Sequence, residues 1–161
     1  MSKKILYNSL MKNSIENKDC IANWISKAHS KLRTSMSQKL KQYNLTVEQR
    51  QILLLLYGFK SMTQSEICKE TLSESSNITV TLKRMEQNDY ILKAKHPKDK
   101  RTTLIYPTQK AMDIEKDLKE VGVNSLDYFL EDVTEEEHDI AVSVIKKMYK
   151  KALEEELESM M

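Results

Sequence analysis

The side chains most capable of specific chemistry lie between residues 75 and 110. A predicted helix at the start of this segment opens with short polar side chains: Ser75, Ser76, Asn77, Thr79 and Thr81. Hydroxyl and amide groups of this size can reach a base edge or a phosphate with no bulky group in the way. The segment also carries eight basic and three acidic side chains, and this excess of positive charge favours a polyanionic partner.

A short basic turn follows this helix. Two short segments, 91–95 and 103–106, predict a pair of strands, and their connection, 96–101, is short, polar and basic. A hydrogen-bonding helix beside a basic hairpin predicts an interface with double-stranded DNA. The alternative is that both features are ordinary solvated surfaces.

Helices predicted from the spacing of apolar residues must position this segment. In the helix that starts near residue 75, Ile78, Leu82 and Met85 recur at helical spacing and predict its buried face. A run of leucines predicts a central core helix at 47–57. The other predicted elements, in chain order, are a helix at 18–43, a short strand at 61–62, a helix from 63, a long helix from 108 to about 130 and a last helix after 134.

Capping boxes predict three of the helix starts. In this motif a threonine and a Glu or Gln three residues later each satisfy a backbone N–H of the other. The three pairs are Thr46 with Gln49, Thr63 with Glu66, and Thr134 with Glu137. Gly58 predicts the end of the core helix, Gly122 predicts a bend in the long helix, and Asn88-Asp89 predicts a turn with a left-handed residue.

Composition limits the class of protein. The 161 residues include 2 glycines and 2 prolines, with 40% hydrophobic and 31% charged residues, which favours a mostly helical protein over an all-β fold. No apolar run approaches the roughly 20 residues that cross a bilayer, and the first residues show no export signal. Cys20 and Cys68 fit reduced thiols, so we expect a cytoplasmic protein with no membrane partner.

Charge is distributed unevenly along the chain. Residues 1–74 carry 12 basic and 6 acidic side chains, whereas residues 111–161 carry 6 basic and 15 acidic ones. A basic front and an acidic tail would orient the protein on a polyanion with the C-terminal part facing away. Clustering of charges on solvated faces is the alternative.

Strongly amphipathic helices flank the central segment. In the last helix, Ile140, Val144, Ile145, Met148 and Tyr149 form part of an apolar stripe, and such a stripe needs a cover. We expect two chains to exchange helices in a homodimer; alternatively, the helices fold back on their own chain. The predicted segments are 1–44 for dimerisation, 45–110 for DNA binding and 111–161 for dimerisation.

Several short motifs occur in a fixed order between residues 45 and 111. They are Leu45-Thr46 with Gln49, Thr63 with Glu66-Ile67, Ser75 through Met85-Glu86, Tyr90-Ile91, Asp99-Lys100-Arg101 and Pro107-Thr108. This ordered set resembles the MarR family of bacterial winged-helix regulators. Asp89, Pro107 and Ala111 depart from the pattern, because the family has glycine, leucine and glycine at these positions.

The resemblance implies a mainly α fold: a winged helix-turn-helix with a two-stranded β-wing, flanked by long N- and C-terminal dimerisation helices. It places the helix from Ser75 in the major groove of a pseudo-palindromic operator and the 96–101 wing in the minor groove. Arg101 or a neighbouring lysine would contact DNA at the wing tip, with Asp99 bracing it. The residues expected at the DNA are Thr63, Gln64, Ser75, Ser76, Asn77, Thr79, Val80, Thr81, Lys83, Arg84, Lys95, His96, Lys98, Asp99, Lys100 and Arg101.

The resemblance also implies regulation. Members of the family commonly repress transcription and release DNA when a small phenolic or other ligand, or an oxidant, acts on them. Trp24, His29 and Tyr43 are the candidate lining of an effector pocket, although core or dimer packing also explains Trp24. Cys20 is the candidate redox thiol, because peroxide-sensing relatives carry a reactive cysteine early in the first helix; here it falls about half a turn before that position.

Other chemistry has little support in the sequence. His29, His96 and His138 show no metal-binding spacing, and we expect neither a metal nor a cofactor. The sequence has no Gly-rich phosphate loop and no Ser/His/Asp or Cys/His constellation, so we expect no enzyme. The alternative function is a winged-helix protein-interaction or architectural module with little sequence specificity.

Overall fold

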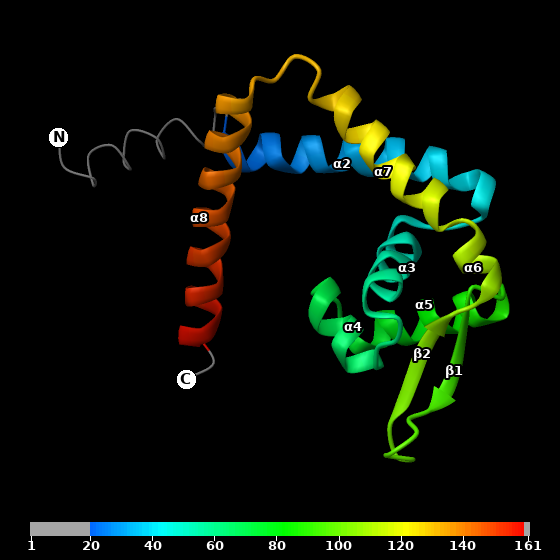
Figure 1. Cartoon of the computed structure of the whole chain (residues 1–161). Coiled ribbons are helices and arrows are strands. Elements are labelled where there is room, and N and C mark those ends of the chain that lie inside the picture. Colours follow the sequence, from blue (N-terminus) through cyan, green and yellow to red (C-terminus); the bar gives the residue numbers. More distant parts are fainter. Residues whose placement is uncertain (1–19, 160–161) are drawn as a thin grey trace. The chain divides into compact units, whose positions relative to one another are not determined.

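The computed structural model describes residues 20–159 and is mainly helical with one antiparallel strand pair (Figure 1). The chain divides into two compact units at the boundary between Gly122 and Val123. Within the described residues, no helix is long and apolar enough to cross a membrane. The expectation about an export signal falls on residues 1–19, outside the described part.

The first unit holds the strand pair and most of the helices. Its elements, in chain order, are α2 (Ile21–Leu40), the 3-10 turn η1 (Lys41–Tyr43), α3 (Val47–Phe59), α4 (Gln64–Thr71), α5 (Ser75–Gln87), β1 (Ile91–Lys95), β2 (Thr103–Pro107), α6 (Gln109–Asp113) and the beginning of α7 (Glu115–Phe129). Figure 1 shows α3, α4 and α5 gathered beside the β1–β2 pair. This order confirms the predicted fold class.

Helix α3 lies at the centre of the core. Its Ile52, Leu53 and Leu56 are fully buried, and burying each side chain of this kind contributes about 1.5–3 kcal/mol. Phe59, beyond the predicted end of this helix at residue 57, is 61% exposed. The other large, fully buried side chains come from α2, α4, α5, β1 and α7: Leu40, Ile67, Leu82, Met85, Ile91 and Leu118.

The start of α3 follows the prediction, and its end does not. Thr46 and Gln49 form the capping box, since the Gln49 N–H donates to Thr46 Oγ1 and the Thr46 N–H donates to Gln49 Oε1 at 2.9 Å. Gly58 was expected to end the helix, and this is wrong. The helix continues to Phe59 and ends at Lys60, which takes the positive φ of 66° and donates its N–H to the Leu56 carbonyl.

Strands β1 and β2 pair antiparallel, from Ile91 opposite Pro107 to Lys95 opposite Thr103. The short strand expected at 61–62 is a single bridge, in which Met62 and Ile105 exchange two backbone hydrogen bonds. This bridge ties the base of the wing to the loop between α3 and α4. The predicted left-handed residue is Asp89, with φ 59°.

The long helix predicted from 108 is interrupted. Thr108 caps it as expected, accepting a hydrogen bond from the Ala111 N–H at 3.3 Å. However, α6 stops at Ile114 and α7 begins at Glu115. Gly122, where a bend was expected, lies inside α7.

The second unit contains the rest of α7 and α8 (Glu135–Ser159). The Thr134–Glu137 capping box at the start of α8 is confirmed, with the Thr134 N–H donating to Glu137 Oε2 at 2.9 Å. No side chain of α8 is buried. We define the apolar stripe as the exposed residues Ile140, Val144, Ile145, Met148, Tyr149, Leu153 and Leu157.

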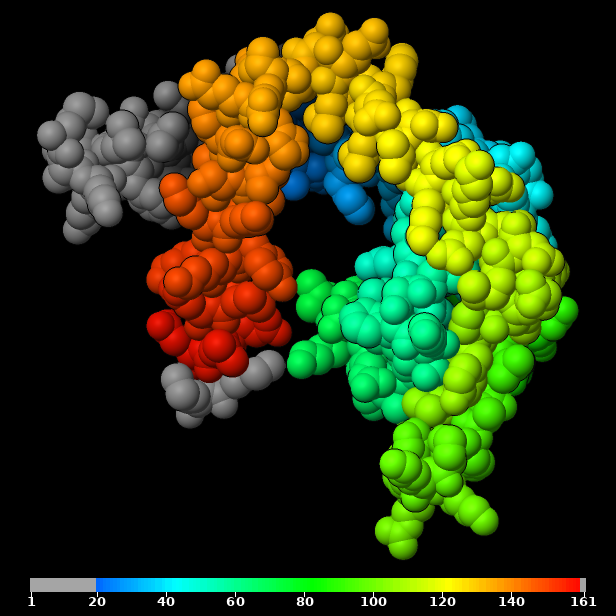
Figure 2. Space-filling view, viewed as in Figure 1, coloured from blue at the N-terminus to red at the C-terminus, as the bar shows by residue number. Residues whose placement is uncertain are grey.

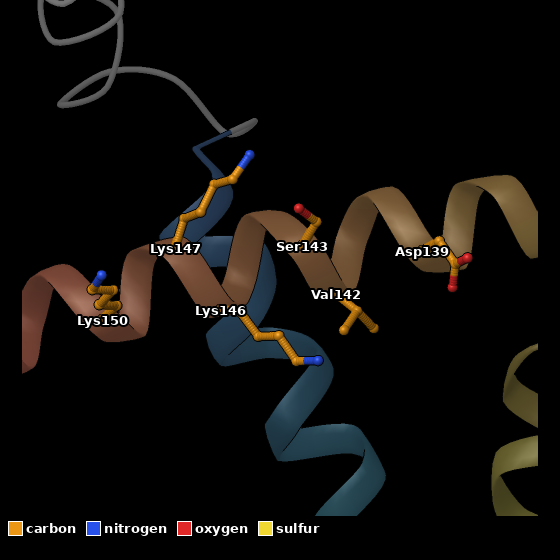
Figure 3. A pocket seen from close by; sticks show the side chains of 6 residues that line it. All are labelled: Asp139, Val142, Ser143, Lys146, Lys147 and Lys150. Carbon is orange, nitrogen blue, oxygen red and sulfur yellow. The ribbon is translucent and has the colours of Figure 1, made fainter.

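Another face of α8 carries lysines. Figure 3 shows the six side chains that border a shallow depression there: Asp139, Val142, Ser143, Lys146, Lys147 and Lys150. All six come from α8 itself, so the depression is an uncovered helix face rather than an enclosed cavity.

Candidate nucleic-acid interface

Helix α5 divides into a buried face and an exposed face. Ile78, Leu82 and Met85 are 4%, 1% and 0% exposed, as their spacing predicted. This burial anchors α5 on the core and leaves the opposite face to solvent. The exposed face carries Ser75, Ser76, Asn77, Thr79, Val80, Lys83 and Arg84.

The start of α5 lies close to α4 because the turn between them is tight. Leu72 ends α4 in the left-handed conformation, with φ 50°, and the Ser73 N–H donates to the Cys68 carbonyl at 3.1 Å. Glu74 is the N-cap of α5 and makes no side-chain capping bond. The first N–H groups of α5 are therefore not covered by a capping side chain.

Gln64 links the two helices. Its Nε2 donates to Thr79 Oγ1 at 2.7 Å and to Ser75 Oγ at 3.1 Å. Thr79 Oγ1 in turn donates to the Ser75 carbonyl at 2.7 Å. Three of the residues expected at the DNA are thus joined to one another, and the Gln64 amide holds the first turn of α5 against α4.

The β-wing is ordered by its own side chains. His96 Nδ1 accepts the backbone N–H groups of Lys98 and Asp99, each at 3.2 Å. Asp99 accepts the Thr102 hydroxyl at 2.6 Å and the Arg101 N–H at 3.0 Å. The Thr102 hydroxyl and the Arg101 N–H hold the pKa of the Asp99 carboxyl below its usual value. Asp99 therefore fixes the backbone from which Arg101 projects.

The cations of this region fall into two sets. Lys93 pairs with Glu86 at 2.7 Å, and Lys110 donates to the Asn88 carbonyl at 2.8 Å while lying over the Tyr90 ring. These two lysines are committed to the protein itself. The other cations of α5 and the wing are also exposed, and among them Lys95 donates to the Thr103 hydroxyl at 3.2 Å: Lys83, Arg84, Lys95, Lys98, Lys100 and Arg101. Figure 2 shows the wing, coloured for residues near 100, projecting from the body of the first unit.

Thr63 and Glu66 form the predicted capping box of α4. The Glu66 N–H donates to Thr63 Oγ1 at 3.2 Å, and the Thr63 N–H donates to Glu66 Oε2 at 2.7 Å. The Thr63 backbone N–H and side-chain hydroxyl lower the pKa of Glu66. Thr63 is thus half-buried and engaged at the helix start, beside Gln64.

The candidate effector residues do not meet within one small volume. Trp24 and His29 lie exposed on α2, and a Lys27 ammonium group lies 4.6 Å from the Trp24 ring centre. Tyr43 lies in η1, roughly 20 Å from His29 along the helix axis at 1.5 Å per residue. Its hydroxyl donates to Asp117 at 3.3 Å, and burial is the main cause of its raised pKa.

The candidate redox and metal residues are equally dispersed. Cys20 is half-buried at the start of α2, where it makes no side-chain capping bond. Cys68 is half-buried on α4. In the part of the chain from residue 20 to 159, no three His, Cys, Asp or Glu side chains converge on a possible metal position.

Sequence reasoning missed two residues that hold the base of α6 and α7. The Tyr57 hydroxyl donates to the Ala111 carbonyl at 2.6 Å, and Arg50 Nε donates to the Leu118 carbonyl at 2.9 Å. Burial raises the pKa of Tyr57 and lowers that of Arg50. A signal was present, because Arg50 is a charged residue two positions before Ile52, where the apolar run of α3 begins.

Comparison with known proteins places this geometry among bacterial regulators. A family model described as transcriptional regulator SarA/Rot matches residues 34–118, more than half of the chain. The regulator MhqR of Bacillus subtilis is 22% identical over 124 residues, covering 77% of this chain and 86% of MhqR. SarZ of Staphylococcus aureus is 26% identical over 90 residues, which cover 56% of this chain and 61% of SarZ.

Solved structures share the fold. A complex of S. aureus MepR with DNA aligns with a TM-score of 0.77 at 19% identity, covering 84% of this chain and 99% of MepR. A cysteine-to-serine variant of Escherichia coli MarR bound to operator DNA aligns with a TM-score of 0.74 at 19% identity, covering 80% of this chain and 92% of MarR. At these identities the alignments establish the fold alone.

Proposed function

The chain belongs to the MarR/SarA family of winged-helix, DNA-binding transcriptional regulators, and from this premise we propose that it is a homodimeric repressor of a pseudo-palindromic operator. The family consists of transcriptional regulators rather than enzymes. The observation that carries the proposal is the exposed polar face of α5 beside a wing with four exposed cations, Lys95, Lys98, Lys100 and Arg101.

In the proposed complex, α5 enters the major groove. Ser76 and Asn77 lie on its exposed first turn, and Val80, 51% exposed, can contact a thymine methyl group. Lys83 and Arg84 lie further along the helix, where they reach phosphates. Ser75 and Thr79 support this surface through Gln64, and Thr81 adds a hydroxyl that donates to the Asn77 carbonyl.

The wing occupies the minor groove in this proposal. Arg101 is the tip contact, because a guanidinium group suits the negative potential of a narrow minor groove. Thr63 and Gln64 approach phosphate from the start of α4. MepR and MarR were each solved with DNA, and the MarR ligand was operator DNA.

The proposed dimer covers the exposed apolar surfaces of the terminal helices. On α2, Ile21, Trp24, Ile25 and Leu32 are 37–52% exposed, and the apolar stripe of α8 is similarly open. A soluble monomer rarely exposes so many large apolar side chains along whole helices. The proposed dimerisation segments remain 1–44 and 111–161, of which 1–19 lie outside the described residues.

Genomic footprint sequencing with the purified protein at two salt concentrations tests this function. We expect a pseudo-palindrome whose half-sites lie about one helical turn apart and an affinity that falls steeply with salt. Diffuse binding with a shallow salt dependence would instead support an architectural or protein-interaction module.

Release from DNA is the finer part of the proposal. We infer that a small ligand near Trp24, His29 or Tyr43, or oxidation at Cys20, lowers operator affinity. Titrating the operator complex with phenolic compounds and with peroxide tests this, with Cys20→Ser as the matched variant for the oxidant. Operator binding that responds to neither treatment contradicts this mode of release.

A further inference from the structure

Arg50 occupies an unusual place for a guanidinium group. It lies on α3, which also carries the core residues Ile52, Leu53 and Leu56, and it is half-buried. Within residues 20–159 it forms no ion pair. Its Nε donates a hydrogen bond to the backbone carbonyl of Leu118 in α7 at 2.9 Å. Burying a charged group without a hydrogen-bond partner is unfavourable, so this bond offsets part of the cost of burying the guanidinium group.

Gly122 gives the Arg50 side chain room. A Cβ atom at this position would lie 2.2 Å from Arg50 Nη2 and 3.2 Å from Cζ, and the third-nearest atom is Arg50 Nη1 at 3.7 Å. Arg50 is therefore the side chain that any larger residue would meet first. Glycine is the least favourable residue inside a helix apart from proline, and at this position it leaves space that the end of the Arg50 side chain occupies.

The two residues meet one helical turn from the shared carbonyl. In an α-helix, the N–H of residue 122 is directed at the carbonyl of residue 118, which is the carbonyl that Arg50 also contacts. Gly122 is the final residue of the first unit, and α7 continues beyond it into the second unit. The contact therefore lies at the C-terminal end of the first unit, within α7.

We propose that Arg50 and Gly122 are a positioning pair that fixes the direction in which α7 leaves the winged-helix unit. In the dimer, this direction sets the separation of the two α5 helices and hence the operator half-site spacing that is accepted. This second step rests on the proposed function. The pair acts through α7, and neither residue needs to touch DNA.

A thermal double-mutant cycle tests the pairing itself. Arg50→Met keeps the apolar stem but removes the atoms that lie over Gly122. Gly122→Ala is expected to lower the melting temperature in the wild-type background, because the new Cβ displaces the guanidinium group. In the Arg50→Met background, Gly122→Ala is expected to raise the melting temperature, because alanine is more favourable than glycine inside a helix. Equal shifts of the melting temperature in both backgrounds would overturn the pairing.

Operators of altered spacing test the consequence for DNA. The half-site centres are moved apart and together by one and two base pairs, at a temperature where every variant is folded. We expect the preference of the wild type for its best spacing to fall about fivefold in Arg50→Met, a size typical of coupling between sites. Affinity for a single half-site should not change, because the proposed contact residues are intact.

The outcomes separate the two proposals. A wild type that binds two half-sites, with variants that keep its full spacing preference, leaves the proposed function standing and overturns the positioning role. A wild type that binds only single half-sites overturns the dimeric function and the spacing claim together. The thermal cycle still decides whether the two residues are paired.

Discussion

At the scale of single residues, Arg101 is the wing cation whose backbone N–H donates to the Asp99 carboxylate. We predict that Arg101→Ala weakens operator binding by about tenfold, the lower part of the range for a good groove contact. Fluorescence anisotropy measures the affinity, and light scattering should show an unchanged oligomer. Lys93→Ala is the matched control, since Lys93 pairs with Glu86. Equal affinities of the two variants contradict the wing assignment.

Asp99 makes the order of the wing depend on pH. Its hydrogen bonds to Thr102 and Arg101 stabilise the carboxylate, so the folded pKa lies below the ordinary value of 3.8. The stabilisation is therefore complete above that value and is lost as the pH falls through the lower folded pKa. We predict an NMR titration midpoint for the Asp99 carboxyl below 3.8, and a rise toward 3.8 in Thr102→Val. A wild-type midpoint at or above 3.8 contradicts this account.

The role of a residue could be predicted where its contacts lie close in the sequence, and not where its partner is distant along the chain. The buried face of α5 followed from the spacing of Ile78, Leu82 and Met85, because a helix repeats every 3.6 residues. The Gln64–Thr79 bond requires the angle between α4 and α5, which periodicity does not specify. The Arg50–Gly122 contact joins two helices that are far apart in sequence, so neither residue alone predicts the contact.

At the scale of elements, α4 is a short helix whose start is held by a capping box. It has eight residues and one buried side chain, Ile67, so packing contributes little to it. We predict that Thr63→Ala, which removes the capping hydroxyl, destabilises the protein by about 1 kcal/mol. Chemical denaturation measures the change, and Thr63→Ser, which keeps the hydroxyl, is the control. Equal losses in both variants would point to the threonine methyl group instead of the cap.

Helix starts were predicted better than helix ends. Thr46, Thr63 and Thr134 each carry a local signal, because a capping box lies within four residues of sequence. The end of α3 depends on Lys60, which adopts a positive φ two residues after Gly58, whereas Gly58 does not. The break at Ile114 likewise carries no proline or glycine, so tertiary packing decides it.

At the scale of the whole molecule, the apolar stripe of α8 is part of the surface proposed to join two chains. Its Ile145 is 47% exposed and Tyr149 is 49% exposed, and the proposed partner is a second copy of the chain. We predict that Ile145→Glu shifts the protein to monomers or aggregates, because a charged side chain in an apolar interface is strongly unfavourable. Deletion of residues 135–161 should have the same effect.

Ser143→Glu is the matched control for this prediction. It adds the same charge to the same helix, but on the face that carries Lys146 and Lys147 (Figure 3), so it should leave the dimer intact. Analytical ultracentrifugation gives the mass of each variant. Because an operator of two half-sites gains affinity from a linked pair of binding units, Ile145→Glu should also bind that operator no more tightly than a single half-site. A stable dimer of Ile145→Glu would exclude the stripe from the interface and leave α2 as the surface that joins the two chains.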